Sequence, residues 1–479
     1  MLLSAIALGA GAPAFLLARG CQSSPGRAPL KPDEAPGDSA LPTPTAPPLP
    51  ARFRAPAVEP TMRVRIKAIR EASQAVVLGE EGAWVEIVTV PDAKPARPGG
   101  QSLTVVPAPL RVARGARGWS VSDGMNYQVV VPADAALVIR LSGPGPGDQR
   151  WRVPAASGVS IDGRAHPGFV MLVPRAAAPI DAEDPEPSTL VGFDVVNHVR
   201  IESYLPGVLA KELFSHWHGE CFKAQAIAAR TYAVVQHLRH VDRRHFDLSN
   251  NTASQVYEGL TTHRRAIDGA RSTLGVVLLY DDLLLPAYYS SCCGGIAAHA
   301  ADGISVDPGH EIAPLRGRAE ADHWCRSAPT YEWRIRSSTA EIERRIVAWA
   351  RARRNDRLAL LNGLRALRVG DHNAFGRPRS FVLEDRVSGG VPIKAEDLRF
   401  ACNFVPEGMR APEKPLLSSF VLDNRLSDAG RSLEVTGRGH GHGVGLCQYG
   451  AQAMAADGRH FDEILTWYYP QALTRRTWA

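Results

Sequence analysis

The sequence lacks the short motifs that identify several large classes of protein. Its glycine-rich loop at residues 437–445 fits neither G-x-G-x-x-G nor G-x-x-x-x-G-K-[ST], so we do not expect this loop to cradle a phosphate. No RRM, KH or helix-turn-helix signature is present, and the small excess of 55 Lys and Arg over 49 Asp and Glu is spread along the chain. No nucleic acid is therefore expected as a partner.

Long apolar runs and internal repeats are lacking as well. After the first 21 residues, no apolar run is long enough to span a bilayer, and no segment of the sequence repeats another. The chain has 479 residues, of which 45% are hydrophobic, so it can bury a sizeable core. Its length predicts two or three domains.

Residues 1–21 are interpreted as a signal peptide or lipoprotein leader, because they form an apolar run of signal-peptide length that ends in small residues. Cys21 follows an imperfect lipoprotein cleavage site, so lipidation of Cys21, simple cleavage and an uncleaved anchor all stay open. Residues 22–60 are rich in Pro and poor in large apolar side chains, which predicts a disordered tether. We therefore expect an exported protein of the cell envelope or periplasm, held at the membrane by this N-terminal anchor.

The folded part is predicted to be an α+β protein. Residues 61–190 contain short apolar runs of β type broken by Gly, Pro and Asp, which predicts a β-rich subdomain. We expect it to pack against a core of mixed helices and strands at residues 191–479. In this core, residues 218–238 have the strongest helical periodicity, and residues 275–291 are typical of a buried hairpin. A second long helix is expected after Ser338, with Ser338 and Glu341 as a capping box.

The stretch GRGHGHGVGLCQYGAQAMAADG at residues 437–458 places two histidines among alternating glycines. A flexible turn is the plain interpretation, but glycine on every side lets the imidazoles of His440 and His442 converge on one point. A ligand or metal role is therefore favoured for these two side chains. The residues that follow are expected to form a short helix closed by Gly458.

Six cysteines follow Cys21, at positions 221, 292, 293, 325, 402 and 447. An even number in an exported protein suggests disulfides. Cys293, Cys325, His299 and His323 also lie near one another in sequence, and thiolate and imidazole are zinc ligands. The spacing has no C-x-x-C pair, so zinc and disulfides stay equally open at this point.

Glu212 is a candidate acid. Most single carboxylates on helices are surface residues, but the neighbours of Glu212 include Val208, Leu209, Leu213 and Phe214. Burial among them would raise its pKa toward the range useful to a general acid.

Several separated stretches, taken together and in this order, resemble the stage II sporulation protein D family, also called the SpoIID/LytB domain. The resemblance begins with VVNHVRIESYLPGVLAKEL and FKAQAIAARTYA, and continues with TASQVYEG, AYYSSCCGG and HWCRSAP. It ends with LRFACNF, GRGHGHGVGLCQYGAQAMA and ILTWYYPQA. The resemblance is firm from about residue 190 onward.

The resemblance implies a lytic transglycosylase of peptidoglycan, because the family's catalytic acid is the Glu of L-x-G-V-x-x-x-E, which is Glu212 here. Such an enzyme cleaves the bond between N-acetylmuramic acid and N-acetylglucosamine and leaves a 1,6-anhydro end. Side chains expected to contact the glycan are Arg230, Tyr232, His440, His442, Gln448 and Tyr449, although core packing is also an open interpretation for Tyr232.

The same resemblance implies a zinc ion, since some members of the family bind zinc through cysteine and histidine. By position, the expected ligands are Cys293, Cys325 and His299. Cys292 and Cys447 stand where the family commonly has hydroxyl residues, so these two thiols are further potential ligands.

Two other functions stay open. One is a peptidoglycan-binding module without catalysis that enhances a partner amidase, a role also found in this family. The other is a zinc hydrolase that works through His440 and His442.

Overall fold

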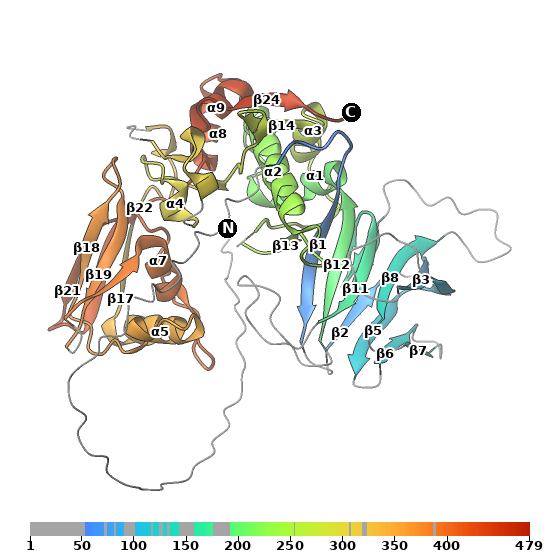
Figure 1. Cartoon of the computed structure of the whole chain (residues 1–479), viewed down its shortest axis with the longest axis horizontal. Coiled ribbons are helices and arrows are strands. Elements are labelled where there is room, and N and C mark those ends of the chain that lie inside the picture. The colour runs from blue at the N-terminus through green and yellow to red at the C-terminus, as the bar shows by residue number, and fades with distance from the viewer. Residues whose placement is uncertain are drawn as a thin grey trace, which may run out of the picture.

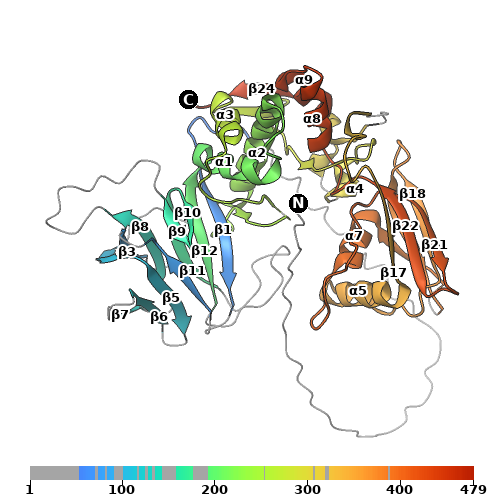
Figure 2. The same cartoon turned by 180° about the vertical axis from the view of Figure 1, so that it is seen from behind.

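The computed structural model describes residues 53–479, apart from residues 71–73, 81–82, 91–100, 116–117, 124–127, 132–134, 143–157, 176–191, 253, 306–307, 319–322 and 387–388. The predicted leader and nearly all of the predicted tether lie outside the described residues. Three units follow one another in Figures 1 and 2: a β-rich unit, a helical layer and a second β-rich unit at the opposite end.

The first unit consists of two sheets, as the alternating apolar runs predict. A seven-stranded sheet has the order β13-β1-β12-β11-β8-β3-β4. Its strands are β1 (Thr61–Ile69), β3 (Trp84–Val90), β4 (Gln101–Pro107), β8 (Ala136–Ser142), β11 (Phe169–Pro174), β12 (Phe193–Arg200) and β13 (Leu248–Ser249). A six-stranded sheet has the order β10-β9-β2-β5-β6-β7. Its strands are β2 (Ala75–Leu78), β5 (Leu110–Gly115), β6 (Gly118–Ser122), β7 (Gln128–Val131), β9 (Val159–Ile161) and β10 (Arg164–His166).

Alternate side chains of the two sheets form one hydrophobic core, which includes Val76, Val112, Trp119, Ile139 and Phe193. The predicted domain boundary at residue 190 falls between β11 and β12. These two strands are nevertheless antiparallel neighbours in the same sheet. The chain therefore leaves the β-rich unit only after β12, whose last residue is followed directly by the first helix.

The helical layer is centred on α2 (Gly219–His240), which is present where the sequence predicts a helix. It packs against α1 (Ile201–Glu212), α3 (Arg264–Ser272), α8 (Gln448–Ala456) and α9 (Phe461–Tyr468). The many alanines of α2 allow these neighbours to approach closely, so the helix is buried on nearly all sides. The predicted hairpin forms as β14 (Val276–Tyr280) and β15 (Leu283–Leu284), and β24 (Leu473–Arg476) extends it to three strands.

The second β-rich unit spans residues 332–438 and has its own hydrophobic core. One sheet is formed by β17 (Glu332–Ser338), β22 (Ser432–Arg438) and β21 (Val421–Ser427), and the other by β18 (Ala366–His372), β19 (Pro378–Glu384) and β20 (Val391–Lys394). Its helices are α5 (Thr339–Ala352), α6 (Asp356–Ala359) and α7 (Ala395–Asn403). The α5 helix begins directly after Ser338, as predicted, but the expected capping box is wrong, because the Ser338 side chain makes no capping hydrogen bond and Glu341 pairs with Arg345.

Short elements connect the helical layer to this unit. They are β16 (Tyr289–Ser290), α4 (Ala300–Gly303), the 3-10 helices η1 (Pro308–His310), η2 (Ala313–Leu315) and η3 (His323–Cys325), and β23 (Leu446–Cys447). Strands predominate in the two end units and helices in the layer between them, and the predicted α+β fold is confirmed.

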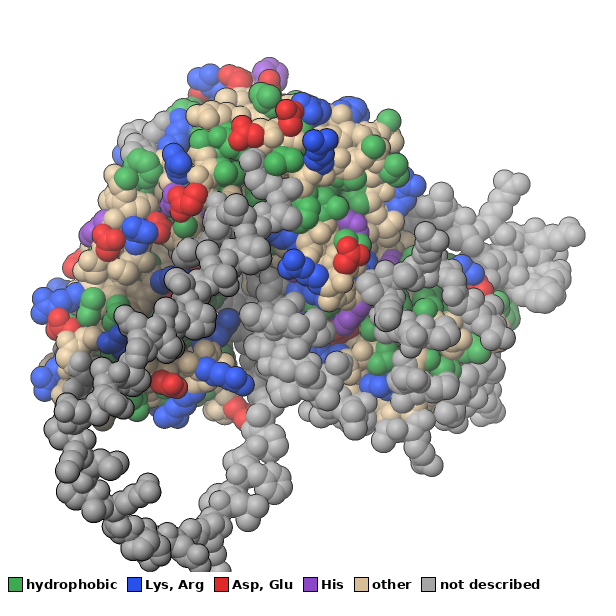
Figure 3. Space-filling model, viewed as in Figure 1, with side chains coloured by type: hydrophobic (Ala, Val, Ile, Leu, Met, Phe, Trp, Pro, Cys, Tyr) green, Lys and Arg blue, Asp and Glu red, His purple; other side chains and the backbone are tan. Residues whose placement is uncertain are grey.

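Two surface properties complete the fold. Among the described residues, no helix combines the length and the apolar character needed to cross a bilayer. Lys and Arg side chains are scattered among acidic and apolar ones over the face drawn in Figure 3, with no single basic patch in that view.

Candidate active site

Glu212 is the last residue of α1, and its side chain is partly buried at the junction of α1, the segment after β13, β16 and α8. The carbonyl end of a helix carries a partial negative charge, which disfavours a carboxylate there. The position therefore favours the protonated form of Glu212 even before its other neighbours are considered.

Three hydrogen-bond donors point at the Glu212 carboxyl group. The side-chain amide of Gln448 donates to Oε2 at 3.1 Å. The backbone N–H of Val256 and the hydroxyl of Tyr289 also donate to it. Burial raises the pKa of Glu212 and the three hydrogen bonds lower it, with burial the larger effect, so the pKa lies above its ordinary value.

The three donors are positioned by two parts of the fold. Gly207, in the helical turn before Glu212, lets the loop after β13 approach α1: a Cβ at this position would lie 2.2 Å from the carbonyl oxygen of Gly259. Tyr289 and Gln448 are brought together by the parallel pairing of β16 with β23, in which Tyr289 is opposite Leu446. The site is thus assembled from segments about 40 to 240 residues apart in the chain.

The Tyr289 hydroxyl belongs to a buried hydrogen-bond chain. It accepts a bond of 2.9 Å from Nε2 of Gln255, and Oε1 of Gln255 accepts one of 3.1 Å from the Tyr204 hydroxyl. Because its lone pair is engaged by Gln255, the Tyr289 proton is directed to Glu212. Sequence reasoning missed Tyr289, Gln255 and Val256, although all three lie in the stretches TASQVYEG and AYYSSCCGG that carry the resemblance.

An aromatic cluster, consisting of Phe214, Trp217 and Tyr449, lies beside Glu212. The ring centroids of Phe214 and Trp217 are 5.2 Å apart, and those of Trp217 and Tyr449 are 5.0 Å apart. Phe214 is 39% exposed although it is large and apolar. An exposed ring two residues from a carboxyl group of raised pKa is suited to contact the apolar face of a sugar.

The glycine-rich loop at residues 437–445, called the histidine loop below, is held in place by hydrogen bonds of its two histidines. His440 pairs through its backbone with Cys292, with N–H···O distances of 2.8 and 3.1 Å, and its side chain is exposed. Nδ1 of His442 accepts a 3.0 Å hydrogen bond from the backbone of Val444, and its ring also bonds the backbone of Tyr289. Burial lowers the pKa of His442 to about 4, so it is neutral at pH 7. These contacts use both ring nitrogens of His442 to hold the loop against β16, which leaves neither for a metal.

The structure corrects the prediction that Arg230 contacts the glycan. Arg230 is completely buried, and its guanidinium group forms an ion pair of 2.8 Å with Glu202. It also donates to the carbonyl oxygens of Ala270 and Val276, so its role is to connect α1, α2, α3 and β14. Tyr232, also on α2, is partly exposed, and its ring lies 6.3 Å from that of Tyr289.

A cysteine cluster, consisting of Cys292, Cys293, Cys325 and Cys447, lies next to the Glu212 site. The sulfur atoms of Cys292, Cys325 and Cys447 are all within 4.8 Å of one another, and Sγ of Cys293 is 3.6 Å from Sγ of Cys325. All four carry free thiols and are buried. The pKa of Cys325 lies well below its usual range, because the thiols of Cys292, Cys293 and Cys447 donate hydrogen bonds to its sulfur.

His299, the third ligand expected from sequence, lies outside this cluster. Its Nδ1 accepts a 3.0 Å hydrogen bond from the backbone of Ala301 at the start of α4, and its Nε2 lies 3.4 Å from a carboxylate oxygen of Glu311. The thiols of Cys292 and Cys447, which sequence reasoning treated as departures from the family pattern, stand close to Cys325 instead.

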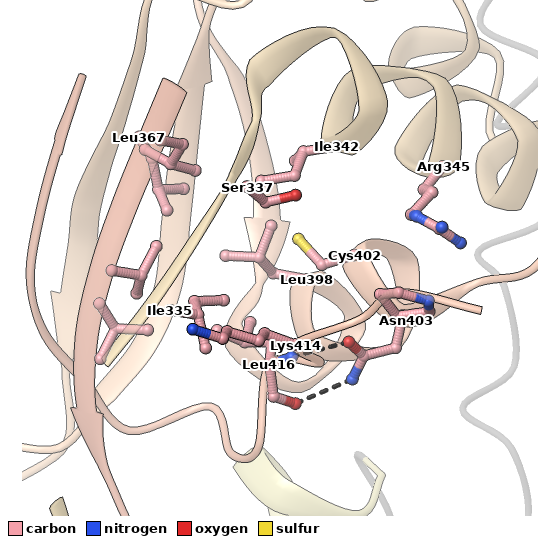
Figure 4. Close-up of a pocket in the computed structure, with 14 residues that line it drawn as sticks. Ile335, Ser337, Ile342, Arg345, Leu367, Leu398, Cys402, Asn403, Lys414 and Leu416 are labelled. Atoms are coloured by element: carbon pink, nitrogen blue, oxygen red, sulfur yellow. Dashed lines mark hydrogen bonds between the residues drawn. The ribbon is translucent and has the colours of Figure 1, made fainter. Parts of the chain in front are cut away.

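A pocket in the second β-rich unit is separate from Glu212 (Figure 4). It lies between the β17-β22-β21 sheet and helices α5 and α7, and none of the described residues lining it carries a carboxylate. Asn403 closes one side by two hydrogen bonds of 2.8 Å to the backbone of Leu416. The pocket offers no acid for catalysis, so Glu212 remains the centre of the candidate site.

Comparisons with known proteins agree with the sequence motifs. The family model described as SpoIID, stage II sporulation protein, matches residues 191–280. The resemblance to the SpoIID family is confirmed. This SpoIID match includes β12, α1 with Glu212, all of α2, and Gln255, whereas the cysteine cluster and the histidine loop lie beyond it.

Full-length relatives extend the similarity beyond the SpoIID match. An uncharacterized protein of Brachyspira hyodysenteriae is 27% identical over 354 residues, which is 73% of this chain and 83% of the relative. Stage II sporulation protein D of Bacillus subtilis is 27% identical over 290 residues, covering 57% of this chain and 74% of the relative. The amidase enhancer of the same organism is 23% identical over 303 residues, covering 56% of this chain and 39% of the relative.

Proposed function

We propose that this protein is a lytic transglycosylase that cleaves peptidoglycan glycan strands, with Glu212 as its acid and base. The observation that carries the proposal is the environment of Glu212. Burial raises its pKa, three donors are aimed at its carboxyl group, and an exposed aromatic side chain stands beside it.

In the first step, protonated Glu212 donates its proton to the glycosidic oxygen between N-acetylmuramic acid and N-acetylglucosamine, and the bond from that oxygen to C1 breaks. The Gln448, Tyr289 and Val256 donors stabilise the carboxylate that this step produces. The muramyl C6 hydroxyl then attacks C1, and Glu212 accepts its proton. The products are a 1,6-anhydro end and a free N-acetylglucosamine hydroxyl, and no water is consumed.

One carboxylate is sufficient for this reaction, because the nucleophile belongs to the substrate. Ordinary glycosidases need a second carboxylate about 5–9.5 Å from the first. None of the described groups that shift the pKa of Glu212 is another carboxylate, which supports a mechanism with a single acid.

Substrate contacts are proposed for three at least partly exposed rings: Phe214, two residues after Glu212, Tyr449, directly after Gln448, and Tyr232, whose ring lies 6.3 Å from that of Tyr289. For Gln448, we propose that the main role is its hydrogen bond to the Glu212 carboxyl group rather than a direct contact with the glycan. The exposed side chain of His440 is available to a glycan, whereas His442 positions Tyr289. Export through the leader, with attachment to the envelope membrane by residues 1–60, would give the enzyme access to its substrate.

The test is digestion of purified sacculi by the wild-type protein and by Glu212→Gln, with muropeptides identified by mass spectrometry. We expect 1,6-anhydro-muropeptides from the wild type and none from Glu212→Gln. Glu413→Gln, which changes an exposed carboxylate in the second β-rich unit, is the matched control and should release wild-type amounts. Unchanged release by Glu212→Gln would contradict the assignment.

A second candidate function is favoured by the similarity to an amidase enhancer. In that case sacculi would stay intact with this protein alone, and solubilisation would increase only when a cell-wall amidase is added. Glu212→Gln would then enhance the amidase as well as the wild type does. Including the amidase in the same digestion experiment therefore separates the two functions.

A further inference from the structure

The basic excess of the chain lies in the second β-rich unit. Of the 55 Lys and Arg and the 49 Asp and Glu, residues 332–438 contain 20 and 14, which leaves 35 of each in the rest of the chain. The excess therefore follows the structural units, and this corrects the even spread expected from the sequence. A positively charged unit attached to a neutral remainder is suited to an anionic partner.

Four exposed arginines gather at one corner of this unit, where α5 ends and α6 begins. This arginine corner consists of Arg351, Arg353, Arg354 and Arg357. Asp356 is the one acidic residue of the stretch, and within the described part of the chain none of the four guanidinium groups is held in an ion pair. Figures 1 and 2 place α5 at the opposite edge of the molecule from α8 and α9, so the corner lies away from the Glu212 site.

Arg354 occupies a backbone position that favours glycine. The N–H of Asn355 donates to the carbonyl oxygen of Ala350 at 2.8 Å, and the N–H of Arg354 donates to that of Arg351 at 3.2 Å. This is the Schellman arrangement, in which the residue after the C-cap takes a left-handed conformation. The φ angle of Arg354 is 54°, which is unfavourable for a residue with a side chain. The arginine therefore does not serve the helix end, and its exposed charge indicates another role.

An exposed leucine accompanies the arginines. Leu360 directly follows α6 and is 74% exposed, whereas the nearby Leu358 and Leu361 are buried and hold this part of the chain against the unit. A lipid surface offers a contact to both kinds of side chain, because arginines pair with headgroup phosphates and an apolar side chain enters the boundary of the acyl chains. A dissolved phosphate polymer offers only the first of these contacts.

We propose that the arginine corner and Leu360 dock this protein on a membrane surface that contains anionic phospholipids. The contact adds to the attachment by residues 1–60 proposed above, and two weak contacts with one surface reinforce each other. Because α5 and α8 lie at opposite edges, this docking leaves the Glu212 site uncovered. The proposal does not depend on lytic activity, since its evidence lies outside that site.

The test is flotation of the full-length protein with vesicles over a range of lipid concentrations. One set of vesicles contains phosphatidylcholine alone, and the other an equal mixture of phosphatidylcholine and phosphatidylglycerol. The neutral vesicles measure the contribution of the N-terminal residues, and the ratio of the two affinities measures the arginine corner. We expect a ratio far above one that falls as salt is added, because charges are screened beyond about 8 Å at physiological ionic strength. A ratio near one would overturn the proposal.

Variants then separate the charge from the fold. Loss of one arginine near an anionic surface weakens binding about fivefold, so Arg354→Gly should lower the affinity ratio by this factor. Its thermal stability should be retained, because glycine suits the backbone at this position. Arg351→Gln combined with Arg357→Gln should lower the ratio about 25-fold. Leu360→Ser should weaken binding to the mixed vesicles about tenfold, through the lost apolar contact.

Arg431→Gln is the matched control. Arg431 is exposed, and its carbonyl oxygen accepts a hydrogen bond from Thr339 at the start of α5, so the length of the helix separates it from the corner by about 20 Å. This variant should keep the wild-type ratio, and a loss as large as that of Arg354→Gly would overturn the proposal. Soluble polyphosphate tests the other partner. If it binds as tightly as the mixed vesicles and Leu360→Ser binds normally, the partner is a phosphate polymer and docking on lipid is wrong.

Discussion

Replacement of Glu212 by Gln should change how the stability of the protein depends on pH. Burial raises the pKa of Glu212, so the folded protein keeps this proton at pH values where the unfolded chain has already lost it. The amide side chain of the Glu212→Gln variant cannot titrate, but its oxygen can still accept the hydrogen bond from Gln448. The variant therefore isolates the effect of the buried charge.

The sign and size follow from proton linkage. Below the ordinary pKa of glutamate, the side chain is protonated in both states, and its contribution to stability is fully present. As the pH rises from that value to the raised pKa of the folded state, this contribution is lost at about 1.4 kcal/mol per pH unit, and above the raised pKa the loss is complete. The Glu212→Gln variant should thus become more stable relative to the wild type across this interval and keep its advantage at higher pH.

The assay is urea unfolding, followed by tryptophan fluorescence, at a series of pH values for the wild type, Glu212→Gln and the control Glu413→Gln. The described residues form three large hydrophobic cores, which can unfold in separate steps. We therefore compare the free energies of unfolding of the variant and the wild type only within the same transition. Glu413→Gln, at an exposed position, should follow the wild-type curve. Parallel curves for Glu212→Gln and the wild type would refute the conclusion that burial raises the pKa of Glu212.

Two further predictions concern the donors and the aromatic cluster. Tyr289→Phe removes a donor that lowers the pKa of Glu212, and since a hydrogen bond to a charged group contributes about 1.5–3 kcal/mol, the carboxylate should be disfavoured by about tenfold or more. Activity requires the acid form, so the decline of the sacculus-digestion rate at high pH should move to higher pH, and an unchanged profile would contradict this. Phe214→Ala removes an exposed ring that contributes about 1 kcal/mol of sugar contact, so KM for soluble glycan strands should rise about fivefold with little change in kcat. A fall in kcat alone would show that Phe214 acts on Glu212 instead.

Much of the fold could be predicted from local periodicity. The β-rich first unit, the α2 helix and the hairpin of β14 and β15 all come from apolar stretches of the sequence, and each is present in the region where it was predicted. The separate unit at residues 332–438 was not predicted, because its strands and helices are individually ordinary and only long-range pairing, such as β17 with β22, separates it from the rest. Such pairing joins residues about a hundred positions apart and leaves no local signal.

Residues of the candidate site were predicted where they belong to a sequence motif. They were missed or misassigned where only the packing of the fold determines their position. Glu212 and Gln448 belong to recognisable stretches and do lie together. Arg230 was misassigned because arginines are usually exposed, whereas neighbours cover α2 on nearly all sides and bury the guanidinium group too. The grouping of Cys292 and Cys447 with Cys325 depends on the parallel pairing of β16 with β23, which the sequence does not reveal.

The raised pKa of Glu212 reflects a balance between burial, which favours the acid, and three donors, which favour the carboxylate. A catalyst that gives up a proton and takes one back needs both, since burial alone would make the acid too weak and the donors alone would leave it ionised. The two effects come from different parts of the fold. Burial and the Val256 donor depend on α1 and the loop held at Gly207, whereas the Tyr289 and Gln448 donors depend on the segments that border the cysteine cluster. Loosening that cluster would therefore remove stabilisation of the carboxylate while leaving the acid buried, so the packing of the cysteine cluster affects how readily Glu212 releases its proton without taking part in the reaction.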